Sequence, residues 1–380
     1  MTRTLAIDGG QPAFPDGLPL VRPRFDDVPA VMSRLEQVLT SGQLTNGRNV
    51  AELEERLAER LGVPHVVAVG SCTAGLMLVY QALGVRGDVV MPSHTFSASA
   101  HAVVWAGAQP RFADIEPTRA TLDPVSAEKA IEGATAISAT HIYGHPAEVE
   151  ELESLAGEHG IPLVFDSAHA LGSLRGSRPI GGFGTAEVFS MSPTKVTVAG
   201  EGGIVATRDP GVAEHVQIGR NYGNPGDYNC RFPGLNARMS ELHAVLALAS
   251  LEGLDTRIAE RATAIDTFED ALSVSSNIRV LRPSAGDTST FKDMTLHLLD
   301  DGADAHRVQT ALNAEGVDSR RYFWPPIHHQ DAYARDERLD LPVTDTLARR
   351  LLTVPLTCTD RPNLERLATV VREVAASSHS

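Results

Sequence analysis

The chain has 380 residues, 42% of them hydrophobic, so it can bury a large core and we expect one large domain and one smaller one. Acidic residues outnumber basic ones by 48 to 33, and the formal net charge of −15 argues against nucleic acid or an anionic membrane as a partner. Cys72, Cys230 and Cys358 lie far apart without Cys-x-x-Cys spacing, which indicates neither a disulfide framework nor a zinc site. The sequence opens without a signal-peptide pattern, and no apolar run approaches the ~20 residues of a membrane span, so we expect a reducing, cytoplasmic setting.

The N-terminal region is expected to form an arm and two helices. Residues 1–27 are rich in Pro, Gly and Asp, which predicts irregular structure. A helix is predicted over 28–40, and it stops at the turn-forming residues 41–47. A second helix, over 50–61, shows an amphipathic leucine spacing and is followed directly by a glycine.

From residue 65 onward, short apolar runs alternate with amphipathic helices. This alternation predicts right-handed βαβ units and a mostly parallel, buried sheet, in which ligands collect at the carboxyl ends of the strands. The predicted strands are 65–69, 88–91, 110–113, 134–139, 162–166, 186–190 and 204–207, and the predicted helices are 73–83, 96–106, 124–131 and 147–159.

The C-terminal third is expected to form the smaller domain. A helix is predicted from beyond Arg238 to about Gly253, and a second helix, over 256–272, starts this domain. Its other predicted elements are strands 278–281 and 295–299, a helix over 305–315 and a final helix after Pro362. We therefore expect a large domain over 1–253 and a small one over 254–380.

One lysine stands out in the stretch from Phe189 to Gly203. Lys195 is one of only three lysines, with Lys129 and Lys292, and it lies in an uncharged segment between two strands. A lysine on a surface turn would be the ordinary interpretation. An amine in a desolvated pocket, however, has a lowered pKa and can condense with an aldehyde, which a guanidinium cannot do.

Polar groups also follow several of the other strands. The sequence Gly70-Ser71-Cys72-Thr73 opens a helix and offers an anion cradle, although Ser71 or Thr73 could be an ordinary N-cap. Phe96 follows the second strand, where a core phenylalanine is the alternative. Asp166 ends a very apolar strand, where a carboxylate is costly to bury unless a cation faces it or it caps a helix.

These positions together fit one cofactor, pyridoxal 5′-phosphate (PLP). PLP needs an amine, a carboxylate that keeps its pyridine nitrogen protonated, an anion cradle for its phosphate and flat groups on both ring faces. Lys195 and Asp166 would supply the first two, as the catalytic residues. The cradle would consist of Ser71, Cys72, Thr73 and Ser190, and the ring would lie between Phe96 and Ala168.

The same motifs resemble the fold-type I PLP enzymes, and among them the DegT family of sugar aminotransferases. The resemblance rests on Ser-Gly-Gln-Leu-Thr-Asn-Gly at 41–47, Gly-Ser-Cys-Thr-Ala at 70–74, Pro-x-x-Thr-Phe at 92–96, Asp-Ser-Ala-His-Ala at 166–170, Phe-Ser-x-x-x-x-Lys at 189–195, Gly-Glu-Gly-Gly at 200–203 and Gly-Leu-Asn-Ala-Arg-Met-Ser-Glu at 234–241. It implies an α/β fold: a large domain with a mostly parallel seven-stranded sheet between helices, and a smaller α+β C-terminal domain.

The resemblance also implies further site residues. Asn236 would complete the phosphate cradle of the neighbouring subunit in a homodimer with shared active sites. His169 would contact the phenolic oxygen of PLP, and Tyr322 and His328 would face the substrate, although their segment could instead be a loop that packs the domains together. The sequence departs from the family pattern at Cys72, where glycine is more usual, at Ala237, where an aromatic is frequent, and at Pro193-Thr194.

The activity that the resemblance implies is transfer of an amino group from L-glutamate to C3 or C4 of a nucleotide-linked keto-6-deoxyhexose, with thymidine diphosphate as the first choice of nucleotide. Amination of a keto-cyclitol is an alternative within the family. A related sugar dehydratase is disfavoured, because the family replaces the lysine by histidine in that enzyme. A non-catalytic PLP-binding or regulatory protein is a further alternative, which has no need of both Lys195 and Asp166.

Overall fold

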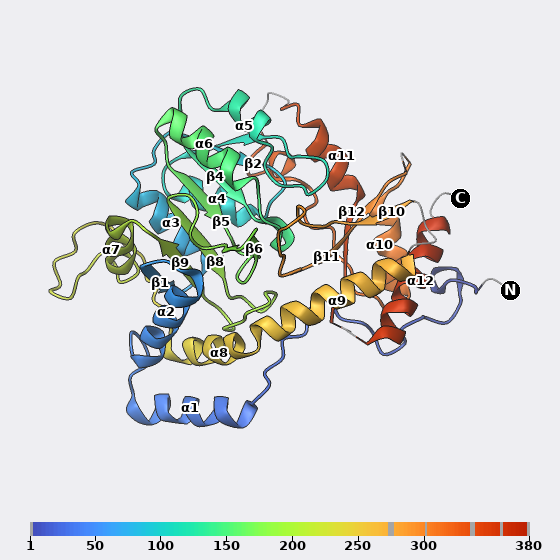
Figure 1. Cartoon of the computed structure of the whole chain (residues 1–380), viewed down its shortest axis with the longest axis horizontal. Coiled ribbons are helices and arrows are strands. Elements are labelled where there is room, and N and C mark those ends of the chain that lie inside the picture. The colour runs from blue at the N-terminus through green and yellow to red at the C-terminus, as the bar shows by residue number, and fades with distance from the viewer. Residues whose placement is uncertain (1–2, 273–276, 301, 335–338, 358–359, 378–380) are drawn as a thin grey trace.

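A computed structural model describes residues 3–272, 277–300, 302–334, 339–357 and 360–377. Its centre is a seven-stranded sheet in the order β1-β9-β8-β5-β4-β2-β3 (Figure 1). The mostly parallel α/β sheet that the sequence predicts is confirmed, with strand bounds that shift by two residues at most. The strands are β1 (His65–Val69), β2 (Asp88–Pro92), β3 (Gln109–Ala113), β4 (Ala134–Thr140), β5 (Leu163–Asp166), β8 (Ala186–Ser190) and β9 (Gly203–Thr207).

Strand β9 is the one strand of this sheet that runs against its neighbours, pairing antiparallel with both β1 and β8. Residues 191–202, which join β8 to β9, contain no helix. A parallel return would need a crossover connection, so the chain turns back beside β8 as an antiparallel strand. This return places Lys195 in a loop directly above the edge of the sheet.

Two apolar cores lie on the two faces of the sheet. Along β1, Val66 and Ala68 pack into one core while Val67 and Val69 pack into the other, because successive side chains of a strand point to opposite faces. The first core is covered by α2 (Arg48–Leu61), α5 (Pro124–Ala130), α6 (Val149–His159) and α8 (Glu241–Glu252), and the second by α3 (Cys72–Ala82), α4 (Ser97–Trp105) and α7 (Pro210–Gly219).

A separate core lies around the C-terminal three-stranded antiparallel sheet β10-β11-β12, at the right of Figure 1. Its elements are β10 (Ile278–Val280), β11 (Met294–Leu298), β12 (Leu351–Val354), α9 (Leu254–Leu272), α10 (Ala305–Ala314) and α12 (Arg361–Ser377). Leu5 and Phe14 of the N-terminal arm are buried in this core. The arm, which includes a short 3-10 helix η1 (Ala6–Asp8), is therefore anchored far from α1 (Val28–Ser41).

Apart from short 3-10 helices, the sequence patterns overlooked five elements. These are the two strands of the small hairpin β6–β7 (Leu174–Arg175 and Arg178–Pro179), α7, α11 (Pro342–Arg350) and β12. Helix α11 runs directly into β12, and no glycine or proline separates the helical residues from those of the strand.

The sequence analysis predicted no disulfide framework for the three cysteines. Cys72 and Cys230 are free thiols, and Cys358 lies outside the described residues.

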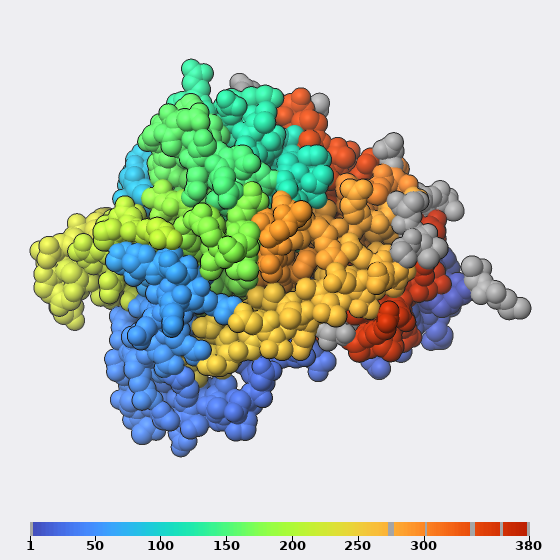
Figure 2. Space-filling view, in the orientation of Figure 1, coloured from blue at the N-terminus to red at the C-terminus, as the bar shows by residue number. Residues whose placement is uncertain are grey.

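Two parts of the large domain extend from its body. Helix α1 lies beneath α8 at the bottom of Figure 1, and the loop of residues 220–235 projects to the left, as Figure 2 also shows. Tyr228, within this loop, is 94% exposed. None of the described helices is both long enough and apolar enough to cross a membrane.

Candidate active site

A cavity of about 410 Å³ lies at the carboxyl ends of the parallel strands. Asp166 ends β5, Ser190 ends β8, and Thr140 ends β4, so three neighbouring strands deliver polar side chains to the same place. Cavities of this size hold small ligands, and this edge of a parallel sheet is where they bind. The predicted residues Ser71, Cys72, Thr73, Phe96, Asp166, Ala168, His169, Ser190, Lys195 and Tyr322 all line this cavity.

Lys195 lies in the cavity wall contributed by the β8–β9 loop. Burial, and then the charge of nearby Lys292, lower the pKa of its amine from 10.5 to about 8, against the opposite effects of Asp293, Cys72 and Asp166. At pH 7.4 a pKa of about 8 leaves roughly a fifth of the side chain as the free amine. A nucleophilic lysine requires this property.

Asp166 is 5% exposed and its two carboxylate oxygens have different partners. Ser99 Oγ donates to Oδ2 at 2.6 Å, and the backbone N–H of Ala168 donates to Oδ1 at 3.1 Å. Ser99 in turn lies 3.2 Å from Thr95 Oγ1. These contacts fix the carboxylate at the cavity floor, where it can face a cationic group of a bound ligand.

The N-terminus of α3 forms another wall of the cavity. Ser71 is its N-cap, accepting the N–H of Ala74 at 3.1 Å, so the ordinary capping interpretation is confirmed while the same residue lines the cavity. Burial, and then the charge of Asp166, raise the pKa of the Cys72 thiol well above its usual value, so this thiol stays neutral. A Cβ at Gly203 would lie 2.5 Å from Cys72 N, which explains why β9 begins with glycine beside this helix start.

His169 and the aromatic residues face the cavity from two sides. The backbone N–H of Tyr143 donates to His169 Nδ1 at 3.1 Å, and burial, followed by the charges of Lys195 and Lys292, keeps the pKa of His169 well below its usual value. The ring is therefore neutral, with its proton on Nε2. Phe96 contacts Phe323, whose ring also stacks on His169 at a centroid distance of 6.5 Å.

Several cavity residues were not predicted from the sequence. Lys292 Nζ donates to both carboxylate oxygens of Asp293 at 2.8 Å and lies 4.8 Å from the centroid of the Tyr322 ring. The rarity of lysine was the available signal, since it applied to Lys292 as much as to Lys195. Phe323, which lines the cavity, and Ser99, which lies behind it and donates to Asp166, were not singled out from the sequence either.

Two predicted site residues are not brought to this cavity. His328 lies instead between Ser93 and Asp345, with its Nδ1 2.6 Å from Ser93 Oγ and its Nε2 3.4 Å from Asp345 Oδ1. The local reason is its backbone: the N–H of His328 also donates to Ser93 Oγ, which turns the ring away from the cavity. Asn236 is exposed and accepts from Arg238 Nη2 at 3.1 Å, next to the projecting loop.

The residues that do meet here fit PLP. The cavity combines an amine of lowered pKa, a buried carboxylate fixed by two donors, and a helix start whose first N–H groups lack intrahelical partners and can hold a phosphate. His169 Nε2–H offers a donor to a phenolic oxygen, and Phe96 an aromatic face.

The profile of the DegT/DnrJ/EryC1/StrS aminotransferase family matches residues 27–375. The chain is 32% identical to the UDP-N-acetyl-3-dehydro-alpha-D-glucosamine 3-aminotransferase of Acidithiobacillus ferrooxidans, over 90% of this chain and 93% of the other. It is 33% identical to the dTDP-3-amino-3,4,6-trideoxy-alpha-D-glucose transaminase of Streptomyces venezuelae, over 90% and 91%. The crystal structure of DesI in the presence of its TDP-sugar product superimposes with a TM-score of 0.93 at 36% identity, covering 98% of this chain and 97% of that one.

The match extends over almost the whole chain, and the aligned folds agree in both the large sheet and the C-terminal part. The cavity supplies the amine and the carboxylate that PLP chemistry requires. The chain therefore belongs to the DegT/DnrJ/EryC1/StrS family of PLP-dependent aminotransferases.

Proposed function

We propose that this aminotransferase moves an amino group from L-glutamate to C3 or C4 of a nucleotide-linked keto-6-deoxyhexose, with dTDP as the nucleotide. The observation that carries the proposal is the lowered pKa of Lys195 in the same cavity as the buried Asp166. The choice of acceptor is supported by the relatives, which are named for UDP-, dTDP- and TDP-linked sugars. A cytoplasmic setting is part of the proposal, supported by the free thiols of Cys72 and Cys230.

When bound, PLP supplies an aldehyde that captures amines and a ring that accepts electrons from the carbon next to the nitrogen. Lys195 Nζ would hold the cofactor and, once released, would take and return a proton as the general base and acid. Asp166 would keep the proton on the ring nitrogen, with its own position fixed by Ser99. His169 Nε2–H would hold the phenolic oxygen.

The substrate contact that we propose is Tyr322, which lines the cavity and faces Lys292. The backbone carbonyl of Tyr322 accepts from Tyr143 Oη, so the large domain fixes the position of this residue. We leave His328 out of the substrate site because its ring faces Ser93 and Asp345.

We also propose a homodimer in which Asn236 reaches the phosphate cradle of the neighbouring subunit. Its exposed position beside the projecting loop of residues 220–235 supports this arrangement. The test combines two weakly active variants, Lys195→Ala and Asn236→Ala, after unfolding and refolding together. Random reassociation makes half of the dimers mixed. If the sites are shared, each mixed dimer has one intact site out of two, so roughly a quarter of the wild-type activity should return. No recovery in dimers that sizing shows to be mixed would contradict sharing.

The function itself is tested with a panel of nucleotide keto sugars and keto-cyclitols, with glutamate as the donor. We expect 2-oxoglutarate to appear with a dTDP-linked 3-keto or 4-keto-6-deoxyhexose, and NMR of the product identifies the aminated carbon. If product forms only from the keto-cyclitols, the proposed sugar acceptor is wrong and a keto-cyclitol takes its place. If no amino donor changes the absorption of the PLP-bound protein, the non-catalytic alternative is favoured.

A further inference from the structure

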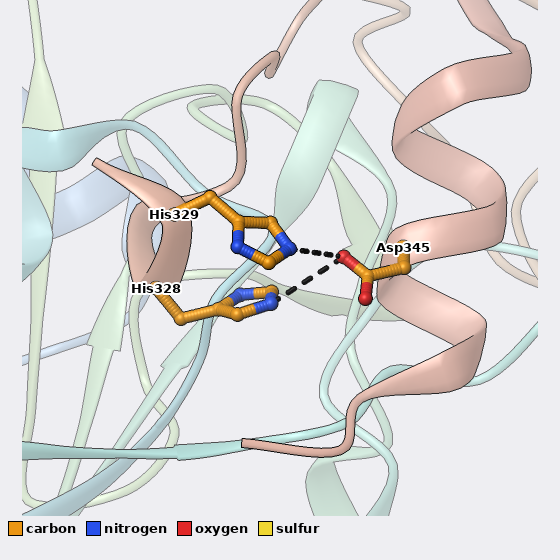
Figure 3. A group of neighbouring side chains, drawn as sticks. All are labelled: His328, His329 and Asp345. Atoms are coloured by element: carbon orange, nitrogen blue, oxygen red, sulfur yellow. Dashed lines mark hydrogen bonds and ion pairs between the residues drawn. The ribbon is translucent and has the colours of Figure 1, made fainter. Parts of the chain in front are cut away.

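His328, His329 and Asp345 form a cluster outside the cavity, at the junction of two C-terminal elements. The histidines belong to the 3-10 helix η3 (Ile327–His329), and the aspartate to α11. Figure 3 shows both imidazole rings directed toward the carboxylate across the gap between η3 and α11. His329 Nε2 lies 2.7 Å from Asp345 Oδ1 and His328 Nε2 3.4 Å from the same oxygen.

The hydrogen bonds of His328 leave one ring nitrogen without a partner. His328 is 7% exposed, and within the part of the chain that the structure describes its Nε2 is buried and has no hydrogen-bond partner. Its other nitrogen, Nδ1, lies 2.6 Å from Ser93 Oγ. With the proton on Nε2, this N–H would face Asp345 Oδ1 at 3.4 Å. With the proton on Nδ1, the ring donates to Ser93 and directs its Nε2 lone pair toward the carboxylate, which is the arrangement that a cation bound between them would select.

We propose that His328 Nε2, His329 Nε2 and Asp345 Oδ1 bind a divalent transition-metal cation of the zinc class. The three ligand atoms lie within 4.8 Å of one another. Tetrahedral zinc, with bonds of about 2.0–2.2 Å to nitrogen and oxygen, spaces its ligand atoms by about 3.4 Å. The His328–Asp345 distance already has this value, whereas the His329–Asp345 pair must widen, and His329 has a half-exposed side chain that can rotate.

The surroundings have the features of a zinc site with three protein ligands. Ser93 Oγ holds the nitrogen of His328 that does not face the cation, which is the usual outer support for a metal-binding histidine. The exposed sides of His329 and Asp345 leave a path for the ion and a position for water.

The cation would join segments that are far apart in the sequence. The backbone N–H of Ile327 donates to the carbonyl of Ser93, in the turn between β2 and α4, and the carboxylate of Asp114 accepts from Val343 and Thr344 at the start of α11. A bound cation would therefore stabilise the contact between the C-terminal part and the large domain. The site lies next to the segment that brings Tyr322 and Phe323 into the cavity. Its role is structural, and it is independent of the proposed transamination.

The test uses the tag-free, PLP-bound protein after removal of metals with a chelator. Isothermal titration with ZnCl2 should show one tight site per chain. Asp345→Asn and His329→Gln, which keep similar side-chain shapes, should weaken it by about 100-fold or more, and Ser93→Ala by about 10-fold. Zinc should also raise the Tm of the wild type but not that of Asp345→Asn.

The matched control is His306→Gln, which removes an exposed histidine of α10 outside the cluster and should bind zinc as the wild type does. Addition of CaCl2 should not displace zinc, because calcium prefers six to eight oxygen ligands. The proposal is overturned if the wild type binds no zinc in the micromolar range, or if Asp345→Asn and His329→Gln bind it as tightly as the wild type.

Discussion

Two lysine–aspartate pairs lie at the cavity in very different arrangements: Lys195, Asp166 and Lys292 line it, and Asp293 is bound to Lys292. Lys292 and Asp293 are neighbours in the sequence, both buried, and paired with each other at 2.8 Å through both carboxylate oxygens. Lys195 and Asp166 reach the same cavity from different strands, and Asp166 is held by Ser99 and Ala168. The first pair neutralises its own charges, whereas the second leaves an amine and a carboxylate available to a ligand.

The comparison shows that residue type alone does not decide whether a lysine remains available to a ligand. The Lys292–Asp293 pair is satisfied internally and acts on the site through its charges, and Lys292 and Asp293 shift the pKa of Lys195 in opposite directions. The reactivity that we propose for Lys195 therefore depends on its own desolvation and on the fact that it has no carboxylate as a neighbour in the sequence.

Replacing the reactive lysine should have the largest effect. Lys195→Ala should lower turnover on the order of 10⁴-fold or more, because it removes both the amine that holds the cofactor and the proton carrier. Borohydride reduction of the wild type followed by peptide mass spectrometry should place the PLP label on Lys195. A label on Lys292 would reverse the comparison between the two lysines.

Replacing the free carboxylate should come next. Asp166→Asn should lower turnover by about 10²–10⁴-fold, since the ring nitrogen would lose the group that keeps it protonated. The measurement is the rate of 2-oxoglutarate formation, together with the PLP content of the purified variant. Near-normal turnover at full PLP content would show that Asp166 is not the pyridinium partner.

A smaller effect is expected from the residue that fixes this carboxylate. Ser99→Ala removes the 2.6 Å hydrogen bond to Asp166 Oδ2 and should lower turnover by about 10-fold, the value of one hydrogen bond to a charged group. Ser99→Thr, which keeps the hydroxyl, should retain most of the activity. Equal losses in both variants would point to packing instead of the hydrogen bond.

The smallest effects should come from the paired residues, and they should have opposite signs. Lys292→Met removes a positive charge that lowers the pKa of Lys195, so this pKa should rise and less free amine should be present at pH 7.4. Asp293→Asn removes a negative charge that raises it, so the pKa should fall and more free amine should be present. The pKa can be measured in the apoprotein from the pH dependence of acetylation at Lys195. Shifts of the same sign in both variants would contradict the electrostatic coupling.

Much of the fold was predictable because periodicity is a local property. The seven strands of the large sheet are short apolar runs, and the structure places each of them within two residues of its predicted bounds. Helix α11 and strand β12 were missed because one passes directly into the other, and no residue with special turn geometry marks the boundary.

The sequence by itself determined the chemistry that was available: one lysine in an uncharged loop, an aspartate after an apolar strand and a helix start with hydroxyls. These residues follow strands, so the parallel topology alone brings them to one edge. Only the tertiary structure decided which other groups join them, because Ser99, Lys292 and Phe323 approach through contacts between distant segments. For the same reason His328 belongs with Asp345, since a hydrogen bond to Ser93, 235 residues away, sets the direction of its ring.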